Sequence, residues 1–124
     1  MSDKRKILMV DDDPTFCELT REVLEKIGYD SFAVGDAEKA RTVFVDDPQQ
    51  FDLIILDHIL SGVQGEELAA DFLHLCPDIP IALYTGAVVS LEKVRSKGIR
   101  AVINKPLTKN EFAAAIANVL NNVP

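Results

Sequence analysis

The stretch that indicates the fold is Ile7-Leu8-Met9-Val10-Asp11-Asp12-Asp13-Pro14. Its first four residues form a short, continuous apolar run, which is typical of a strand that is buried on both faces of a parallel sheet. Asp13 and Pro14 have the form of a helix N-cap followed by proline at the first helical position. The stretch therefore predicts a buried strand, an acidic turn and the start of a helix.

The same succession of apolar strand and amphipathic helix occurs five times along the chain. Further strands are expected at residues 31–34, 53–56, 79–84 and 100–103, and helices at residues 14–27, 35–47, 66–75, 90–97 and 108–120. This alternation predicts an α/β fold, a parallel sheet covered by helices on both faces. Right-handed crossovers and the chain length favour a flavodoxin-like, doubly wound (βα)5 sheet of five strands in the order 2-1-3-4-5.

Helical spacing and capping signals support the predicted helices. The apolar residues that recur at helical spacing are Phe16, Leu19, Val23 and Ile27 in the first helix, Leu68, Phe72 and Leu75 in the third, and Phe112, Ala115, Ile116, Val119 and Leu120 in the last. Thr108 and Glu111 have the spacing of a capping box at the start of the last helix.

Length and charge limit the classes of function. The 124 residues suit one domain with one core, and a formal net charge of −7 argues against a surface that binds nucleic acid or an anionic membrane. The charged N-terminus precedes only four apolar residues, too few for a signal peptide or a membrane span, so we expect a cytoplasmic protein. Cys17 and Cys76 have no CxxC partner and are expected to be free thiols in apolar helical patterns.

Polar side chains follow four of the predicted strands. Asp11 and Asp12 follow the first strand, Asp57 the third, Thr85 the fourth and Lys105 the fifth. In the predicted strand order these four strands are neighbours, and ligands of such sheets bind beyond the carboxyl ends of the strands. The fold therefore predicts that three carboxylates, a hydroxyl and an ammonium group share one rim.

The chemistry of this rim indicates a cation and a phosphoryl group. Carboxylates gathered at one place repel each other, and a hard cation such as Mg²⁺, which prefers oxygen ligands, removes that cost. A hydroxyl and an ammonium group donate to phosphoryl oxygens. Two plainer interpretations stay open for the residues taken singly: the acidic run is a solvated turn in which Asp13 caps a helix, and Asp57 is a polar residue that ends a strand.

Taken together, these residues resemble the receiver domain of response regulators, the CheY-like phosphoacceptor module of two-component signalling. The segments that carry the resemblance are Val10-Asp11-Asp12, Leu56-Asp57 with Gly62 and Gly65, Tyr84-Thr85-Gly86, and Lys105-Pro106. Each segment is short, but their order, spacing and strand-end positions span essentially the whole chain. The resemblance implies that residues 1–124 form a single receiver domain.

The resemblance also implies roles for individual residues. Asp57 would take a phosphoryl group from the phosphohistidine of a kinase, as one step of a phosphorelay. The domain would catalyse its own phosphorylation and dephosphorylation without being an enzyme in the usual sense. Asp11, Asp12, Asp57 and the backbone carbonyl of Ile59 would hold Mg²⁺, with Mn²⁺ as a substitute. Thr85 and Lys105 would bind the phosphoryl oxygens, and the bond between Lys105 and Pro106 is typically cis in the family.

The partners that the resemblance implies are a sensor histidine kinase or phosphotransfer protein, and a downstream protein partner or output domain. No direct contact with nucleic acid or membrane is expected. The surface formed by the fourth helix, fifth strand and fifth helix would change on phosphorylation and is the face expected in a homodimer. The sequence leaves open whether the chain acts alone or belongs to a longer protein.

Some positions depart from the family pattern. Val102 stands where the family commonly has an aromatic ring that moves behind the threonine, so the usual switch is in doubt. Gly86 replaces a usual alanine, and a glycine there should loosen the loop after Thr85. Strand alternation points the side chain of His58 away from that of Asp57, towards packing or solvent.

Two alternatives compete with a phosphoacceptor. Asp11, Asp13 and Thr15 also match the nucleophile motif of haloacid-dehalogenase-type phosphatases, in which Asp11 would be the nucleophile and Asp13 the acid and base. That family places further carboxylates after the lysine to bind Mg²⁺, whereas here only Glu111 follows, inside a capping box. The chain also lacks room for the substrate cap that the family uses. The second alternative is a pseudo-receiver, which keeps the fold but is not phosphorylated; the complete acidic, hydroxyl and lysine set argues against it.

Overall fold

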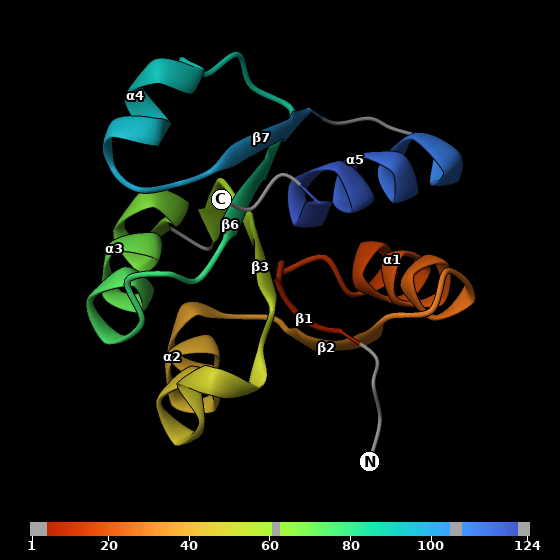
Figure 1. Ribbon diagram of the computed structural model, residues 1–124, viewed down its shortest axis with the longest axis horizontal. Helices are drawn as coiled ribbons and strands as arrows, with labels where there is room; N and C mark the ends of the chain where they lie inside the picture. Colours follow the sequence, from red (N-terminus) through yellow and green to blue (C-terminus); the bar gives the residue numbers. More distant parts are fainter. Residues whose placement is uncertain (1–4, 61–62, 105–107, 122–124) are drawn as a thin grey trace.

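Five parallel strands form the central sheet in a computed structural model that describes residues 5–60, 63–104 and 108–121 (Figure 1). The strands are β1 (Lys6–Val10), β2 (Asp30–Val34), β3 (Leu53–Asp57), β6 (Ile81–Thr85) and β7 (Ala101–Asn104). Their order is β2-β1-β3-β6-β7, which is the predicted order 2-1-3-4-5. The predicted flavodoxin-like topology is therefore confirmed.

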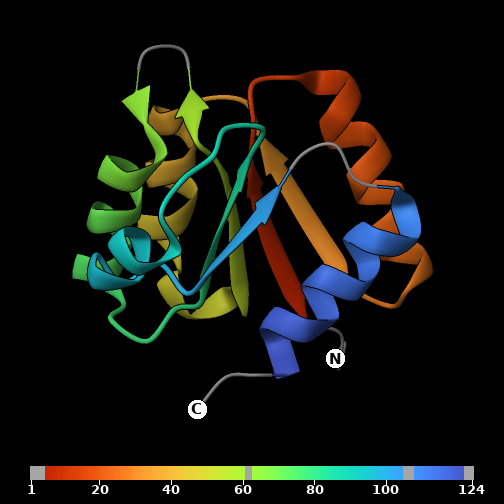
Figure 2. The same ribbon diagram turned by 90° about the horizontal axis from the view of Figure 1, so that it is seen from above.

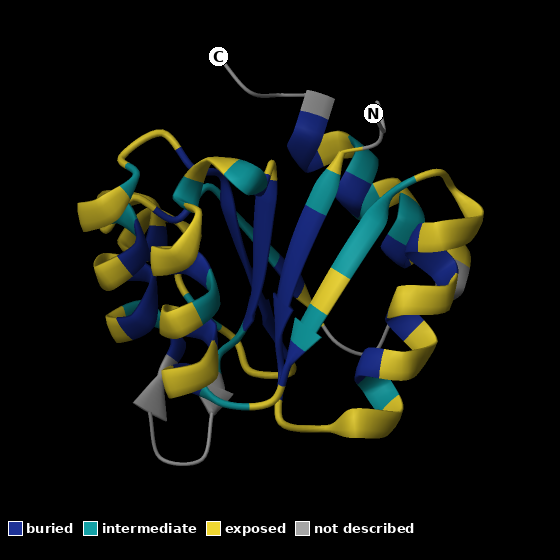
Figure 3. Ribbon diagram, turned by 90° about the horizontal axis from the view of Figure 1, so that it is seen from below, coloured by how far each residue is buried: buried dark blue, intermediate teal, exposed yellow. Residues whose placement is uncertain are grey.

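Helices cover both faces of this sheet, as Figure 2 shows. One face is covered by α1 (Pro14–Lys26) and α5 (Lys109–Asn121), which contact each other. The other face is covered by α2 (Ala37–Asp46), α3 (Gly65–Leu75) and α4 (Leu91–Ser96). The sheet is consequently buried from both sides, while the helices expose their outer surfaces (Figure 3).

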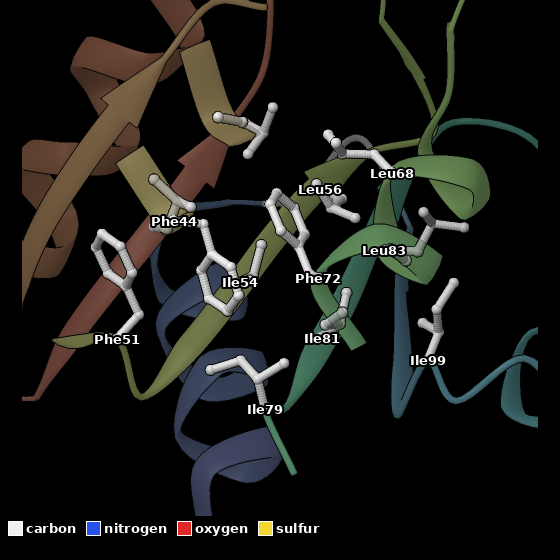
Figure 4. Close-up of a cluster of buried hydrophobic side chains, with 14 of the residues drawn as sticks. Phe44, Phe51, Ile54, Leu56, Leu68, Phe72, Ile79, Ile81, Leu83 and Ile99 are labelled. Carbon is white, nitrogen blue, oxygen red and sulfur yellow. The ribbon is translucent and has the colours of Figure 1, made fainter. Parts of the chain in front are cut away.

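A separate apolar core lies on each face of the sheet. On the α2–α3–α4 side, Phe44 packs against Phe72 with ring centroids 4.8 Å apart, and strand residues such as Ile54 and Leu83 complete the cluster (Figure 4). On the α1–α5 side, Tyr84 stacks on Phe112 with centroids 5.5 Å apart. Two buried cores fix the sheet between its helices, so the strand ends keep defined positions.

Besides shifts of one or two residues at the ends of elements, the structure differs from the sequence expectations in three places. Leu19, Ile27 and Leu75 are exposed, although the helical spacing predicts each of them on the apolar face of its helix. A short 3₁₀ helix at Pro48–Gln50, which was not predicted, follows α2. The segment after Asp57 was expected to be a loop but contains an antiparallel pair of two-residue strands, β4 (Ile59–Leu60) and β5 (Val63–Gln64).

The helix ends follow the predicted capping signals. The side chain of Asp13 accepts hydrogen bonds from the backbone N–H groups of Thr15 and Phe16 at the start of α1. At the start of α5, the backbone N–H of Thr108 donates to Glu111 Oε1, and the backbone N–H of Glu111 donates to Thr108 Oγ1, both at 3.1 Å. These contacts confirm the N-cap and the capping box.

Among the described residues, none of the helices combines the length and the apolar character that crossing a membrane requires.

Candidate functional site

Three carboxylates converge where β1 and β3 end side by side. The register pairs Val10 with Leu56, so the residues that follow them lie at the same edge of the sheet. One oxygen from each of Asp11, Asp12 and Asp57 belongs to a group of atoms that all lie within 4.8 Å of one another. The structure thus brings together the acidic residues that the sequence placed at this rim.

These three residues differ in burial. Asp11 is buried, Asp57 is partly buried and Asp12 is exposed. The backbone N–H of Asp13 donates to Asp11 Oδ1 at 2.9 Å, which holds the buried carboxylate in place. The cluster therefore combines one fixed carboxylate with two that solvent can reach.

Cys17 of α1 lies behind the acidic cluster. Its thiol donates to the backbone carbonyl oxygen of Asp11 with a sulfur–oxygen distance of 3.4 Å. Burial, and next to it the negative charge of Asp11, raises the pKa of the Cys17 thiol to about 11. Cys17 is therefore a neutral, packed thiol at ordinary pH, and both cysteines are free.

The donor set fits a hard divalent cation. Three oxygens of like charge within 4.8 Å repel one another unless a cation or protons lie between them. Mg²⁺ takes oxygen ligands and usually keeps several waters, so a cluster with an exposed side suits it better than a closed cage. Asp13 is not part of the cluster and serves as the N-cap of α1.

The backbone of Asp57 is held by the start of α3. A Cβ atom added to Gly65 would lie 2.5 Å from the carbonyl oxygen of Asp57, so only glycine allows this approach. The backbone N–H of Gly65 donates to the carbonyl oxygen of His58 at 2.6 Å. The backbone N–H of His58 in turn donates to the carbonyl oxygen of Tyr84 at 3.2 Å. Asp57 is therefore fixed between α3 and β6.

Thr85 ends β6 and is buried, at 3% exposure. Its hydroxyl oxygen accepts a hydrogen bond from the backbone N–H of Ala87 at 3.0 Å and lies 3.3 Å from Nδ1 of His58. Asp57 and Tyr84 are the last pair of the β3–β6 register. His58 and Thr85 are the next residue on each strand, which explains why they meet.

His58 therefore has a specific partner, which the sequence interpretation missed. Its Nε2 lies 3.7 Å from Glu66 Oε1 at the start of α3, and Glu66 Oε2 lies 2.5 Å from Lys97 Nζ at the end of α4. The signal that points to this contact was present in the sequence. His58 comes directly after Asp57, the last residue of β3, and Thr85 is the last residue of the neighbouring strand β6.

Val102 lies half-buried on β7, packed against the core on the α2–α3–α4 side. It lines a surface groove of about 460 Å³ between α4 and β7, together with Val88, Val89, Leu91 and Arg95 among others.

The remaining predicted site residues are not tested by the geometry. Lys105, Pro106 and Gly62 lie outside the described residues. Ile59 begins β4, two positions after Asp57, and the role of its carbonyl oxygen as a metal ligand stays a prediction.

Comparisons with known proteins agree on one family. The family model described as "Response regulator receiver domain" matches residues 7–117. The chain is 33% identical over 120 residues to the phosphate regulon transcriptional regulatory protein PhoB of Pseudomonas aeruginosa, covering 94% of this chain and 52% of that protein. It is 29% identical over 115 residues to the DNA-binding response regulator MtrA of Mycolicibacterium smegmatis, covering 91% of this chain and 49% of that protein.

Solved structures give the same result. A CheY-like response regulator receiver domain protein from Methanospirillum hungatei superposes with a TM-score of 0.83 at 27% identity, covering 96% of this chain and 95% of that one. A receiver domain protein from Clostridium thermocellum superposes with a TM-score of 0.84 at 22% identity, covering 94% of each chain, and shows likeness of fold. The chain spans about half the length of the curated relatives named above.

Proposed function

The chain belongs to the response-regulator receiver family of two-component systems, and from this premise we propose that it receives a phosphoryl group on Asp57. The observation that carries the proposal is the convergence of the Asp11, Asp12 and Asp57 carboxylates within 4.8 Å at the carboxyl rim of the sheet. Residues 1–124 would then act as one receiver domain.

Asp57 is the nucleophile in this proposal. It ends the central strand β3, and it is partly buried, so a donor can reach its carboxylate while the backbone stays fixed by Gly65. A carboxylate oxygen of Asp57 forms a bond to phosphorus as the P–N bond of a phosphohistidine breaks, and the released imidazole takes a proton from solvent. The product is an acyl phosphate on Asp57.

Asp11 and Asp12 hold Mg²⁺ in the proposal, together with Asp57 and the Ile59 carbonyl, and Mn²⁺ would substitute. When bound, the ion offsets the negative charge of the phosphoryl oxygens and of the carboxylates around them. The hydrogen bond from the Asp13 backbone to Asp11 orients one of these carboxylates before any ligand arrives.

Thr85 and Lys105 bind the phosphoryl oxygens in the proposal. The Thr85 hydroxyl ends the strand next to β3, and rotation of its side chain can turn it from His58 towards a phosphoryl group on Asp57. Lys105 comes directly after β7 in the sequence, and β7 is the next strand in the sheet, so the proposal assigns Lys105 to the same carboxyl rim. Together they would stabilise the charge that develops during transfer.

The proposed partners are a histidine kinase or phosphotransfer protein that supplies the phosphoryl group, and a protein or output domain that reads the result. The relatives named above are described as transcriptional regulatory and DNA-binding proteins. With a net charge of −7, this chain is proposed to signal through protein contacts rather than by binding nucleic acid itself, in the cytoplasm. The proposed responsive face is α4–β7–α5, which would also be the face of a homodimer.

The phosphatase alternative assigns the nucleophile to Asp11 and the acid–base role to Asp13. The described geometry speaks against it, because the Asp13 side chain accepts two backbone hydrogen bonds as the N-cap of α1. An engaged cap is poorly placed to exchange protons with a leaving group.

Mass spectrometry after incubation with acetyl phosphate and Mg²⁺ tests the proposal. We expect the wild type to gain the mass of one phosphoryl group, Asp57→Asn to gain none, and Asp13→Asn to gain it as the wild type does. Failure of the wild type to gain a phosphoryl group would favour a pseudo-receiver. Phosphate release that survives Asp57→Asn but is lost in Asp11→Asn would favour the phosphatase.

A further inference from the structure

A continuous line of polar side chains leads from Thr85 to the outer surface of α3 and α4. It runs from the Thr85 hydroxyl to His58 Nδ1 at 3.3 Å, from His58 Nε2 to Glu66 at 3.7 Å, and from Glu66 to Lys97 at 2.5 Å. Exposure of the side chains rises along this line, from 17% for His58 through 23% for Glu66 to 56% for Lys97. The line therefore connects a buried hydroxyl at the rim with the solvent-facing end of α4.

The hydrogen-bond roles at the buried end follow from the position of the hydrogen on the His58 ring. The Thr85 oxygen accepts from the backbone N–H of Ala87, and the Thr85 hydroxyl hydrogen can donate to His58 Nδ1. With His58 Nδ1 as the acceptor, the hydrogen of the neutral ring lies on Nε2, which faces the Glu66 carboxylate. In this arrangement Thr85 donates to His58 Nδ1, and the Nε2–H group of His58 faces the Glu66 carboxylate at 3.7 Å as an electrostatic contact.

A phosphoryl group on Asp57 would break this arrangement. The Thr85 hydroxyl cannot remain on His58 and also donate its single hydrogen to a phosphoryl oxygen. Once Thr85 turns away, Nδ1 of His58 loses its donor, and a partly buried ring nitrogen without a partner carries a free-energy cost. The ring therefore has reason to reorient, and Glu66 loses the partner on its inner side.

Glu66 and Lys97 join two helices that cover the same face of the sheet. Glu66 lies in the first turn of α3, and Lys97 is the C-cap residue of α4, so their ion pair fixes the end of one helix to the start of the other. A change at Glu66 would be felt at α4, a helix of only six residues with a single buried side chain, Val94. A helix held by so few contacts moves at low cost.

We propose that His58 is a positioning residue that holds the Thr85 hydroxyl in the unphosphorylated chain and transmits its departure through Glu66 and Lys97 to α4. This inference rests on the proposed phosphorylation of Asp57. It supplies a route for the signal in a chain whose Val102 has no ring to follow Thr85. The route lies between α3 and α4, rather than along β7.

The experiment uses beryllium fluoride with Mg²⁺ as a mimic of the phosphoryl group on Asp57. It compares the amide chemical shifts of the chain with and without this mimic, and it measures binding of beryllium fluoride by ¹⁹F NMR. In His58→Asn, the amide group lies near the position of Nδ1, so the contact with Thr85 can form and the contact with Glu66 is lost. In His58→Gln, the amide group lies near the position of Nε2, so the contact with Glu66 can form and the contact with Thr85 is lost. Glu66→Gln removes the charge that pairs with Lys97 and leaves His58, the residue beside Asp57, unchanged. His74→Gln, at an exposed histidine of α3, is the matched control.

In the wild type and in His74→Gln, we expect fluoride binding to shift amides near the site, such as Ala87, and amides of α4 and Lys97. In all three test variants we expect the shifts near the site to remain and those of α4 and Lys97 to fall at least twofold. Variants that bind fluoride and keep wild-type shifts in α4 would overturn the role of His58. A wild type that does not bind beryllium fluoride in the presence of Mg²⁺ would overturn the proposed function, and this inference with it.

Discussion

A Cβ atom on Gly65 would lie 2.5 Å from the backbone carbonyl oxygen of Asp57, so the first residue of α3 touches the strand end that carries the proposed phosphoacceptor. The same added atom would lie 3.2 Å from the carbonyl oxygen of His58. Contact between two backbones cannot be relieved by rotating a side chain. The position of α3 and the position of Asp57 are therefore coupled.

Gly65→Ala should lower the free energy of unfolding by about 1–3 kcal/mol, because the added methyl group must displace backbone rather than a flexible side chain. It should also slow phosphoryl uptake from acetyl phosphate, since Asp57 would move with its backbone. Urea denaturation and mass spectrometry measure the two effects. Gly35→Ala is the control, because a Cβ there would lie 4.0 Å from its nearest neighbour, the Asp11 carbonyl oxygen, which is ordinary contact.

A Gly65→Ala variant with the stability and the phosphorylation rate of Gly35→Ala would show that the helix start can shift without moving Asp57.

The fold was predictable because the central strands are covered on both faces. Such strands appear in the sequence as unbroken apolar runs, as at Ile7-Leu8-Met9-Val10, and the capping residues Asp13 and Glu111 mark helix starts locally. The chain order of strands and helices then restricts the topology through crossover handedness.

The buried side of α1 was harder to predict. Its buried residues are Cys17, Thr20, Val23 and Leu24, whereas the apolar pattern pointed to Leu19. Thr20 can be buried because its hydroxyl donates to the backbone carbonyl oxygen of Phe16 at 2.5 Å. A hydrogen bond within the helix thus allows a polar residue to be buried, and a pattern of apolar residues alone does not predict this burial.

The acidic cluster should make the stability of the chain depend on Mg²⁺. The ion should raise the free energy of unfolding by about 2.7 kcal/mol when its concentration is a hundredfold above the dissociation constant, and a chelator should remove the effect. Asp12→Asn should raise stability without Mg²⁺ by about 1 kcal/mol, because it removes one of three like charges. The same variant should gain less from Mg²⁺ than the wild type.

Urea titrations with Mg²⁺ and with a chelator check this prediction. Asp78→Asn is the control for the loss of one negative charge, since Asp78 is exposed and lies outside the cluster. Equal stabilisation of Asp12→Asn and the wild type by Mg²⁺ would count against a metal site at these carboxylates.

Glu111 should give the chain a measurable dependence of stability on pH. Hydrogen bonds from the backbone and side chain of Thr108 lower the pKa of Glu111 below its ordinary value of 4.5. A carboxyl whose pKa is lower in the folded state stabilises the fold above its unfolded pKa and loses that contribution as the pH falls through the folded pKa. The advantage of the wild type over Glu111→Gln should therefore be full near neutral pH and shrink below 4.5.

Urea midpoints of the two proteins, measured side by side from neutral to acidic pH, check the sign. An advantage that stays constant over this range would mean that the ionised form of Glu111 contributes nothing beyond its hydrogen bond.

The contact between His58 and Thr85 could have been predicted, but its extension to α4 could not. Adjacent strand ends follow from the strand order, so the two residues were bound to be neighbours. The position of Glu66 and Lys97 depends on how α3 and α4 settle on the sheet, which is decided by packing of side chains such as Phe72 and Val94. Such packing joins residues 31 positions apart and leaves no periodic signal in the sequence.

Val102→Ala separates the two routes by which phosphorylation could reach α4. Val102 is half-buried, so removing part of its side chain should lower the free energy of unfolding by about 1 kcal/mol. Val88→Ala, at a fully exposed position of the same groove, is the control for that loss of stability.

If the polar line through His58 carries the signal, beryllium fluoride and Mg²⁺ should shift the α4 amides of Val102→Ala as they do in the wild type. The double variant with His58→Asn should then lose the α4 response to the same extent as His58→Asn alone, because Val102 adds nothing to the coupling. Loss of the α4 response in Val102→Ala by itself would instead mean that the aliphatic side chain on β7 still transmits the movement of Thr85.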